Sequence, residues 1–139
     1  MYKLFNNLQS SAEIIKSGGV GIIKTDTIYG FVASAFNISA VERVYQIKHR
    51  SAAKKCIILA ANYNQLKPFS IKDYDVYKNK VNKYWPGTYS LVLPINGNEF
   101  SYLTLGTPDL AFRVPQNDQL TDYLLQTGPL IAPSANLES

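Results

Sequence analysis

The stretch VGIIKTDTIYGFVASAF at positions 20–36 decides the fold, because it holds two apolar segments joined by a short polar loop. Residues 20–23 are short, β-branched and bounded by glycine, and residues 31–36 form a second apolar run, so each segment predicts a buried strand. The connection from Ile23 to Phe31 is too short for the helical crossover that joins parallel neighbours. The sequence therefore predicts a mixed rather than a wholly parallel sheet.

Outside this stretch, helical and strand patterns alternate without an internal repeat or a linker. This interleaving indicates one α/β domain over residues 1–139, a twisted mixed sheet flanked by helices with functional loops at the strand ends. The predicted helices cover residues 8–17, 62–66, 73–84 and 117–126, and one more is capped by Ser39 and ends near Lys48. Pro68 stops the helix over 62–66. The further predicted strands cover residues 56–60, 89–93, 111–114 and 130–132.

Composition narrows the class of protein. A chain of 139 residues with 46% hydrophobic and 17% charged side chains is typical of a globular domain, and its net charge of +4 favours phosphate-bearing partners only weakly. One cysteine and one histidine match neither an internal disulfide nor zinc-ligand spacing, so no metal site is expected. The absence of a long apolar run and of a leader pattern predicts a cytoplasmic protein in a reducing compartment, with no membrane association.

The polar loop at 24–30 is the first candidate site. Its hydroxyls at Thr25, Thr27 and Tyr29 suit hydrogen bonding to a polar ligand better than nucleophilic attack, because no histidine base accompanies them. The competing interpretation is a turn in which Asp26 and Thr27 bond their own backbone. Spacing alone does not separate the two.

A basic cluster is the second candidate. Lys48 and Arg50 stand two residues apart at a predicted helix end, so both can grip a polyphosphate during phosphoryl or nucleotidyl transfer. The alternative is that both cations merely lie at the negative end of the helix dipole. The nearby Lys54 and Lys55 are expected to be solvated, unless one leans into the site.

The third candidate lies near the other end of the chain. Ser134 and Asn136 present a hydroxyl and an amide two residues apart, which suits a nucleotide phosphate or ribose, although a merely polar loop gives the same pattern. Ser90 begins a predicted strand and can reach the site. Arg113 lies in a short apolar strand, where a buried guanidinium needs an anionic partner.

These segments resemble, in order and spacing, the motifs of the YrdC-like family. The matches are residues 24–30 to P-T-[DE]-T-x-Y-G, Lys48-His49-Arg50 to K-x-R, Trp85-Pro86-Gly87 to W-P-G-P, Ala111-Phe112-Arg113-Val114-Pro115 to A-x-R-x-P, and Ala132-Pro133-Ser134-Ala135-Asn136 to P-S-A-N.

The resemblance implies an L-threonylcarbamoyladenylate synthase, a nucleotidyltransferase that converts L-threonine, bicarbonate and ATP into threonylcarbamoyl-AMP and pyrophosphate for tRNA threonylcarbamoyladenosine. It implies that Mg²⁺ arrives with the nucleotide and that a tRNA-modifying transferase accepts the product. The implied ATP-binding residues are Lys48, Arg50, Ser134 and Asn136, with Lys48 and Arg50 catalytic, and the implied threonine and bicarbonate pocket comprises Thr25, Thr27, Tyr29, Ser90 and Arg113.

The chain departs from the family pattern at several positions. The family's prolines are replaced by Lys24, Ser51 and Thr88, and the sequence stops soon after the P-S-A-N motif, so it is either a minimal, short form of the domain or a truncated one. Two alternatives therefore accompany the synthase: a non-catalytic module that binds double-stranded RNA or tRNA, and a paralogue that binds nucleotide without synthase activity. A carbamoyltransferase module of hydrogenase maturation is disfavoured because such modules lie within much longer chains.

Overall fold

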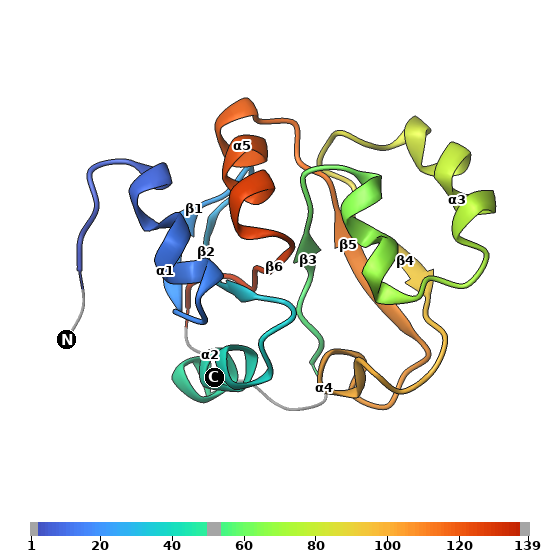
Figure 1. Ribbon diagram of the computed structural model, residues 1–139, viewed down its shortest axis with the longest axis horizontal. Helices are drawn as coiled ribbons and strands as arrows, with labels where there is room; N and C mark the ends of the chain where they lie inside the picture. Colours follow the sequence, from blue (N-terminus) through green and yellow to red (C-terminus); the bar gives the residue numbers. More distant parts are fainter. Residues whose placement is uncertain (1–2, 50–53, 137–139) are drawn as a thin grey trace.

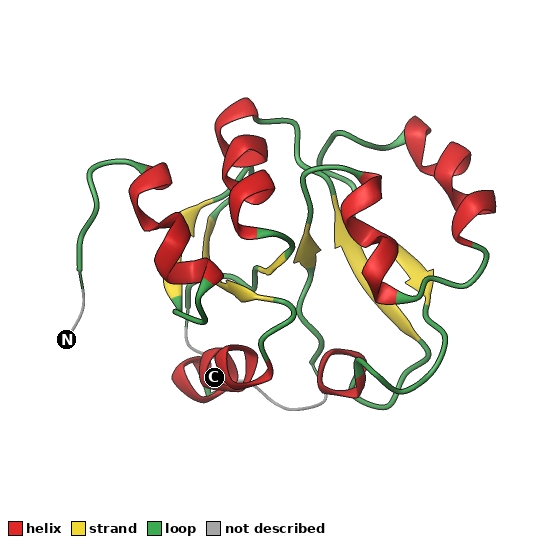
Figure 2. Ribbon diagram, viewed as in Figure 1, coloured by secondary structure: helices red, strands yellow, loops and turns green. Residues whose placement is uncertain are grey.

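The computed structural model describes residues 3–49 and 54–136. Six strands form one mixed sheet in the order β1-β2-β6-β3-β5-β4 (Figures 1 and 2). Only the β3–β5 pairing is parallel among the described strands, so the predicted mixed sheet is confirmed. The strands are β1 (Gly21–Lys24), β2 (Tyr29–Ser34), β3 (Ile58–Leu59), β4 (Leu91–Pro94), β5 (Asp109–Arg113) and β6 (Leu130–Ile131).

The opening stretch folds as a hairpin. β1 and β2 pair antiparallel from Gly21 opposite Val32 to Lys24 opposite Tyr29, so the polar loop is the hairpin turn. Two backbone bonds to the chain's last described loop continue this edge: the Phe31 amide donates to the Pro133 carbonyl at 2.9 Å, and the Ala135 amide donates to Tyr29 at 2.9 Å. The first and last polar segments of the sequence are therefore direct neighbours.

The helices differ from their predicted bounds where local chemistry competes. The cap of α2 is Asn37, whose side chain accepts from the Ala40 amide, and not Ser39 as the sequence suggested. The helix η2 passes through Pro68 and ends one residue later at Phe69, so the proline lies inside its last turn rather than beyond its end. The bounds are η1 (Leu8–Ser11), α1 (Ala12–Lys16), α2 (Ile38–Lys48), η2 (Tyr63–Phe69), α3 (Tyr74–Lys80), η3 (Val81–Lys83), α4 (Ser101–Thr104) and α5 (Asp118–Thr127).

Side-chain alternation divides the core between the two faces of the sheet. Leu59 faces a cluster that α1 and α5 cover, whereas its neighbour Ile58 faces a larger cluster that α2, η2 and α4 cover. Trp85 belongs to the larger cluster and donates its indole N–H to the Tyr89 carbonyl at 2.8 Å, as expected of a core aromatic. Arg113 is paired with Leu59 and is the last residue of β5.

Candidate active site

A cavity of about 500 Å³ lies where three segments distant in sequence meet. Its walls come from the β1–β2 turn, from the segment before β3 together with β5, and from the loop after β6. Of the predicted site residues, Thr25, Thr27, Arg113 and Ser134 line it. A volume of this size lies within the range of about 300–1,000 Å³ that small-molecule sites occupy.

The β1–β2 turn is held by its own threonine. The Thr25 hydroxyl donates to the Ile28 carbonyl at 2.6 Å and accepts from the Thr27 amide at 3.3 Å, and Thr25 is buried. This is the local bonding that the turn interpretation predicted, although through Thr25 rather than through Asp26. The Thr27 hydroxyl lies 3.3 Å from that of Thr25 and is exposed, so of the two it is better placed to meet a ligand.

The loop after β6 approaches the turn closely at Gly30. Gly30 and Ser134 form an isolated antiparallel bridge, and a Cβ on Gly30 would lie 3.2 Å from the Pro133 carbonyl oxygen. A side chain there would push the loop away from β2. Glycine at this position therefore sets the width of the site between Thr25 and Ser134.

Lys48 is fully buried, and its ammonium group holds the loop after β6 in place. Its Nζ donates to the carbonyl oxygens of Ser134 and Asn136 and, at 3.2 Å, to the amide oxygen of Asn136. The Ser134 hydroxyl donates to the same amide oxygen. The end of α2 and the chain's last loop are thus joined through one ammonium group, which brings Lys48, Ser134 and Asn136 together as the sequence predicted.

Arg113 has the anionic partner that its apolar strand required. One guanidinium nitrogen lies 3.0 Å from the Asp26 carboxylate, and another donates to the Ser90 hydroxyl at 3.4 Å. The side chains of Arg113 and Asp26 are only 10% and 6% exposed. Two atoms of the pair, Asp26 Oδ2 and Arg113 Nε, are buried without a hydrogen-bond partner within the described ranges, so each retains capacity to bind a polar ligand.

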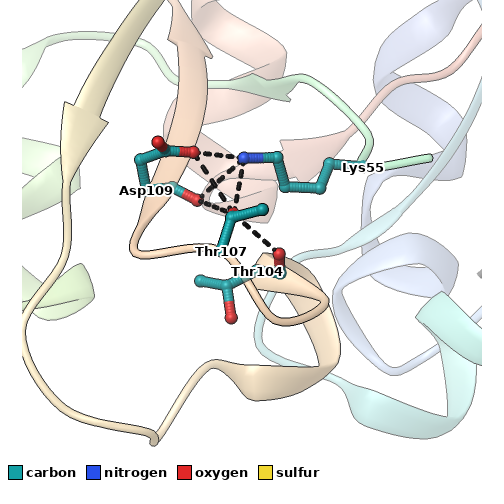
Figure 3. Close-up of polar contacts among 4 residues, drawn as sticks. All are labelled: Lys55, Thr104, Thr107 and Asp109. Atoms are coloured by element: carbon teal, nitrogen blue, oxygen red, sulfur yellow. Dashed lines mark hydrogen bonds and ion pairs between the residues drawn. The ribbon is translucent and has the colours of Figure 1, made fainter. Parts of the chain in front are cut away.

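A second ion pair stands at the rim of the same cavity. Lys55 lines the cavity and extends toward Asp109, where its ammonium binds the carboxylate and, at 2.7 Å, the Thr107 hydroxyl (Figure 3). The bond from Lys55 lowers the pKa of the Asp109 carboxyl below its ordinary value. Lys55 is thus not the solvated side chain that the sequence suggested.

Four of the described site residues do not line the cavity: Tyr29, Lys48, Ser90 and Asn136. Tyr29 is the first residue of β2 and is 60% exposed. Ser90 is connected to the site by the hydrogen bond that its hydroxyl accepts from Arg113. Arg50 lies outside the described residues.

The two charged residues of the second ion pair, Lys55 and Asp109, were not among the predicted site residues. Asp109 and Arg113 lie four residues apart on β5 and so project from the same face of the sheet. That period-two spacing was the available signal for Asp109, but the predicted strand began at Ala111 and omitted it. Lys55 immediately precedes the strand that was predicted from Cys56.

Residues 3–49 and 54–136 lack two features that would point to other kinds of protein. They contain no group of three or more histidine, cysteine, aspartate or glutamate side chains arranged to hold a metal ion. No helix in these ranges is sufficiently long and apolar to span a bilayer.

Several known proteins are similar in sequence to this chain. The Sua5_yciO_yrdC family model, described as "Telomere recombination", matches residues 13–139. The chain is 33% identical over 136 residues to a threonylcarbamoyl-AMP synthase of Photobacterium profundum, with 95% of this chain and 73% of that protein covered. It is 30% identical over 132 residues to a threonylcarbamoyl-AMP synthase of Bacillus subtilis, with 94% of this chain but only 38% of that protein covered.

A solved structure provides the corresponding fold comparison. The crystal structure of P. abyssi Sua5 complexed with L-threonine matches with a TM-score of 0.83 and 29% identity, over 94% of this chain and 38% of that one. The chain therefore spans well under half the length of two of these three proteins.

Proposed function

Because the chain belongs to the Sua5/YciO/YrdC family, we propose that it is a threonylcarbamoyl-AMP synthase, a nucleotidyltransferase that uses L-threonine, bicarbonate and ATP. The observation that carries the proposal is the meeting of Thr27, Arg113 and Ser134 around one cavity. The names of the similar proteins support it further. The chemistry of the reaction then assigns a task to each wall.

The reaction needs positioning and charge neutralisation more than a protein nucleophile. Threonine and bicarbonate condense to a carbamate with loss of water, and a carbamate oxygen attacks the α-phosphorus of ATP. The bond from that phosphorus to the bridging oxygen breaks, and pyrophosphate leaves with the negative charge. Cationic and N–H donors around the phosphates lower this barrier, and a preformed cavity holds the reactants at attacking distance.

The loop after β6 is the proposed site for the ATP phosphates, with Ser134 and Asn136 as its polar groups. Lys48 and Arg50 complete it as the catalytic cations, and Lys48 acts from behind the loop, since its ammonium binds the loop's own oxygens. A buried ammonium behind the loop would stabilise the negative charge that develops on phosphates bound there, because water screens a buried charge only weakly. Mg²⁺ is proposed to arrive with the nucleotide, because one oxygen of Asp26 already binds Arg113.

The opposite wall is the proposed pocket for threonine and bicarbonate. Asp26 Oδ2 and Arg113 Nε, both buried and without a partner in the described part of the chain, suit the acceptor and donor needs of such small polar substrates. Thr25, Thr27 and Ser90 supply hydroxyls around the same pair, and Tyr29 closes the site from the exposed side. A tRNA-modifying transferase as acceptor of the product, and direct contact with RNA, are further parts of the proposal.

Incubation with ATP, labelled bicarbonate and L-threonine, followed by detection of pyrophosphate and of the labelled adenylate, tests the function. We expect pyrophosphate release that requires threonine and falls at least about tenfold in Lys48→Ala and in Arg50→Ala. Lys16→Ala, an exposed lysine in the last turn of α1, is the matched control and should retain activity. Equal pyrophosphate release with and without threonine would contradict the assignment.

A further inference from the structure

Lys55 is the cavity-lining cation for which the reaction scheme has so far no use. Its ammonium is drawn to one side, toward Asp109 and the Thr107 hydroxyl, and Thr107 in turn donates to the Thr104 carbonyl at 2.9 Å (Figure 3). This group connects the segment before β3 with the turn that leads into β5. It therefore holds a long, positively charged side chain at the mouth of the cavity.

The register of the sheet places Lys55 between two very different neighbours. β3 and β6 pair with Ile58 opposite Ile131, and the Ala132 amide continues the ladder by donating to the Ile57 carbonyl at 3.0 Å. Continued by two more residues, this register sets Lys55 opposite Ser134. On its other side Lys55 lies level with Asp109, because Ile58 pairs with Phe112 in the parallel β3–β5 ladder.

The spacing between neighbouring strands is shorter than a lysine side chain. Neighbouring strands lie about 4.8 Å apart, and the flexible four-carbon stem of lysine reaches beyond that to either side. Lys55 and Ser134 both line the cavity, so a side chain that turns from Asp109 toward Ser134 stays beside it. From this backbone position, rotation of the side chain alone would carry the ammonium from one neighbour to the other.

We propose that Lys55 is a further phosphate-binding residue, held in reserve by Asp109 and Thr107 and transferred to the nucleotide phosphates when these occupy the loop at Ser134. This inference rests on the proposed function, because it places ATP at that loop. It adds a cation from the segment before β3 to the two catalytic cations proposed above, Lys48 and Arg50. The occupant it commits to is the phosphate chain, and not the threonine carboxylate.

The exchange is energetically favourable because the ion pair of Lys55 with Asp109 is weak and the contact with phosphate is strong. The side chains of Lys55 and Asp109 are 24% and 32% exposed, so water screens their attraction and the pair resembles surface ion pairs of small net stability. A triphosphate carries several negative charges and many acceptor oxygens, which bind an ammonium group more strongly than one carboxylate does. Asp109 is left at the rim, where water solvates its charge.

The test measures the binding of Mg-ATP and of AMP to the full chain by titration calorimetry at fixed ionic strength. Lys55→Met removes the charge and should weaken Mg-ATP binding about tenfold with little effect on AMP. Asp109→Asn removes the competing carboxylate and should tighten Mg-ATP binding about two- to fivefold. Lys55→Arg keeps the charge and should restore most of the affinity, and Lys16→Met is the control for the loss of a remote lysine.

Each outcome decides one of the two proposals. If the wild type binds Mg-ATP and Lys55→Met binds it with the same affinity, the role of Lys55 is overturned and the synthase assignment stays intact. Weakening by Asp109→Asn as large as that by Lys55→Met shows that the ion pair serves the structure of the rim, which also overturns the inference. Failure of the folded wild-type chain to bind Mg-ATP overturns the proposed function itself. In the synthase assay, Lys55→Met should raise the KM for ATP and leave that for threonine unchanged.

Discussion

The cavity has an ion pair at each end of β5, and the two pairs differ in burial. Arg113 and Asp26 are almost completely buried, whereas Lys55 and Asp109 retain roughly a quarter to a third of their side-chain exposure. A buried pair that loses one member leaves an unsolvated charge, but an exposed pair that separates gains water on both sides. The same chemistry therefore makes a fixed wall at one end and an exchangeable contact at the other.

The comparison also explains why both pairs lie beside one cavity. Arg113 keeps Nε, and Asp26 keeps Oδ2, without a partner among the described residues, so the fixed pair can bind a small polar molecule while it stays together. The Lys55 ammonium donates to Asp109 and Thr107. A ligand must therefore replace one of these contacts before it can bind the ammonium. We expect a preformed pocket at Arg113 and an adaptable one at Lys55.

The largest effect is expected from breaking the buried pair. Asp26→Ala removes the carboxylate that pairs with the buried Arg113 guanidinium. The free energy of unfolding should therefore fall by about 3–5 kcal/mol. Chemical denaturation measures it. The double variant Asp26→Ala with Arg113→Met removes both charges and should regain most of the lost stability, whereas activity should stay absent. A single variant that unfolds at the wild-type denaturant concentration would show that the pair is not a fixed wall.

A smaller effect is expected at the third cation of the site, Lys48. Lys48→Met keeps the apolar stem but removes the donor to the carbonyl oxygens of Ser134 and Asn136, which should cost about 1–3 kcal/mol. Hydrogen exchange should quicken at the amides of Phe31 and Ala135, because both join the last loop to β2. Unchanged protection at these two amides would mean that Lys48 does not fix the loop; Lys16→Met serves as the control.

The smallest effect belongs to the rim pair and depends on pH. The pKa of Asp109 is lowered in the folded protein from an ordinary value of 3.8, so its contribution to stability is complete above that pH and disappears as the pH falls through the lowered pKa. Asp109→Asn should therefore be less stable than the wild type by no more than about 1 kcal/mol at pH 7. The difference should shrink below about pH 3.8. Urea denaturation at several pH values measures this, and a difference that stays constant on acidification would exclude the ionised pair as its cause.

Sequence reasoning predicted the architecture well because most of it depends on local pattern. The hairpin over 20–36 required antiparallel strands on length alone, and the mixed sheet followed from it. The need of Arg113 for an anion also followed from residue type and an apolar strand. The predictions failed where two local preferences competed, as at Ser39 against Asn37 for the cap of α2 and at Pro68 inside η2.

By itself, the sequence determined the elements, the antiparallel start of the sheet and the identity of the polar loops, because periodicity and turn chemistry act over a few neighbouring residues. Only the tertiary structure decided which charged groups meet: Asp26 with Arg113, Lys55 with Asp109, and Lys48 with the last loop. These partners are 54 to 88 residues apart. Electrostatic attraction depends on distance in space and on exclusion of water, and both are set by the register and packing of the whole sheet rather than by spacing along the chain.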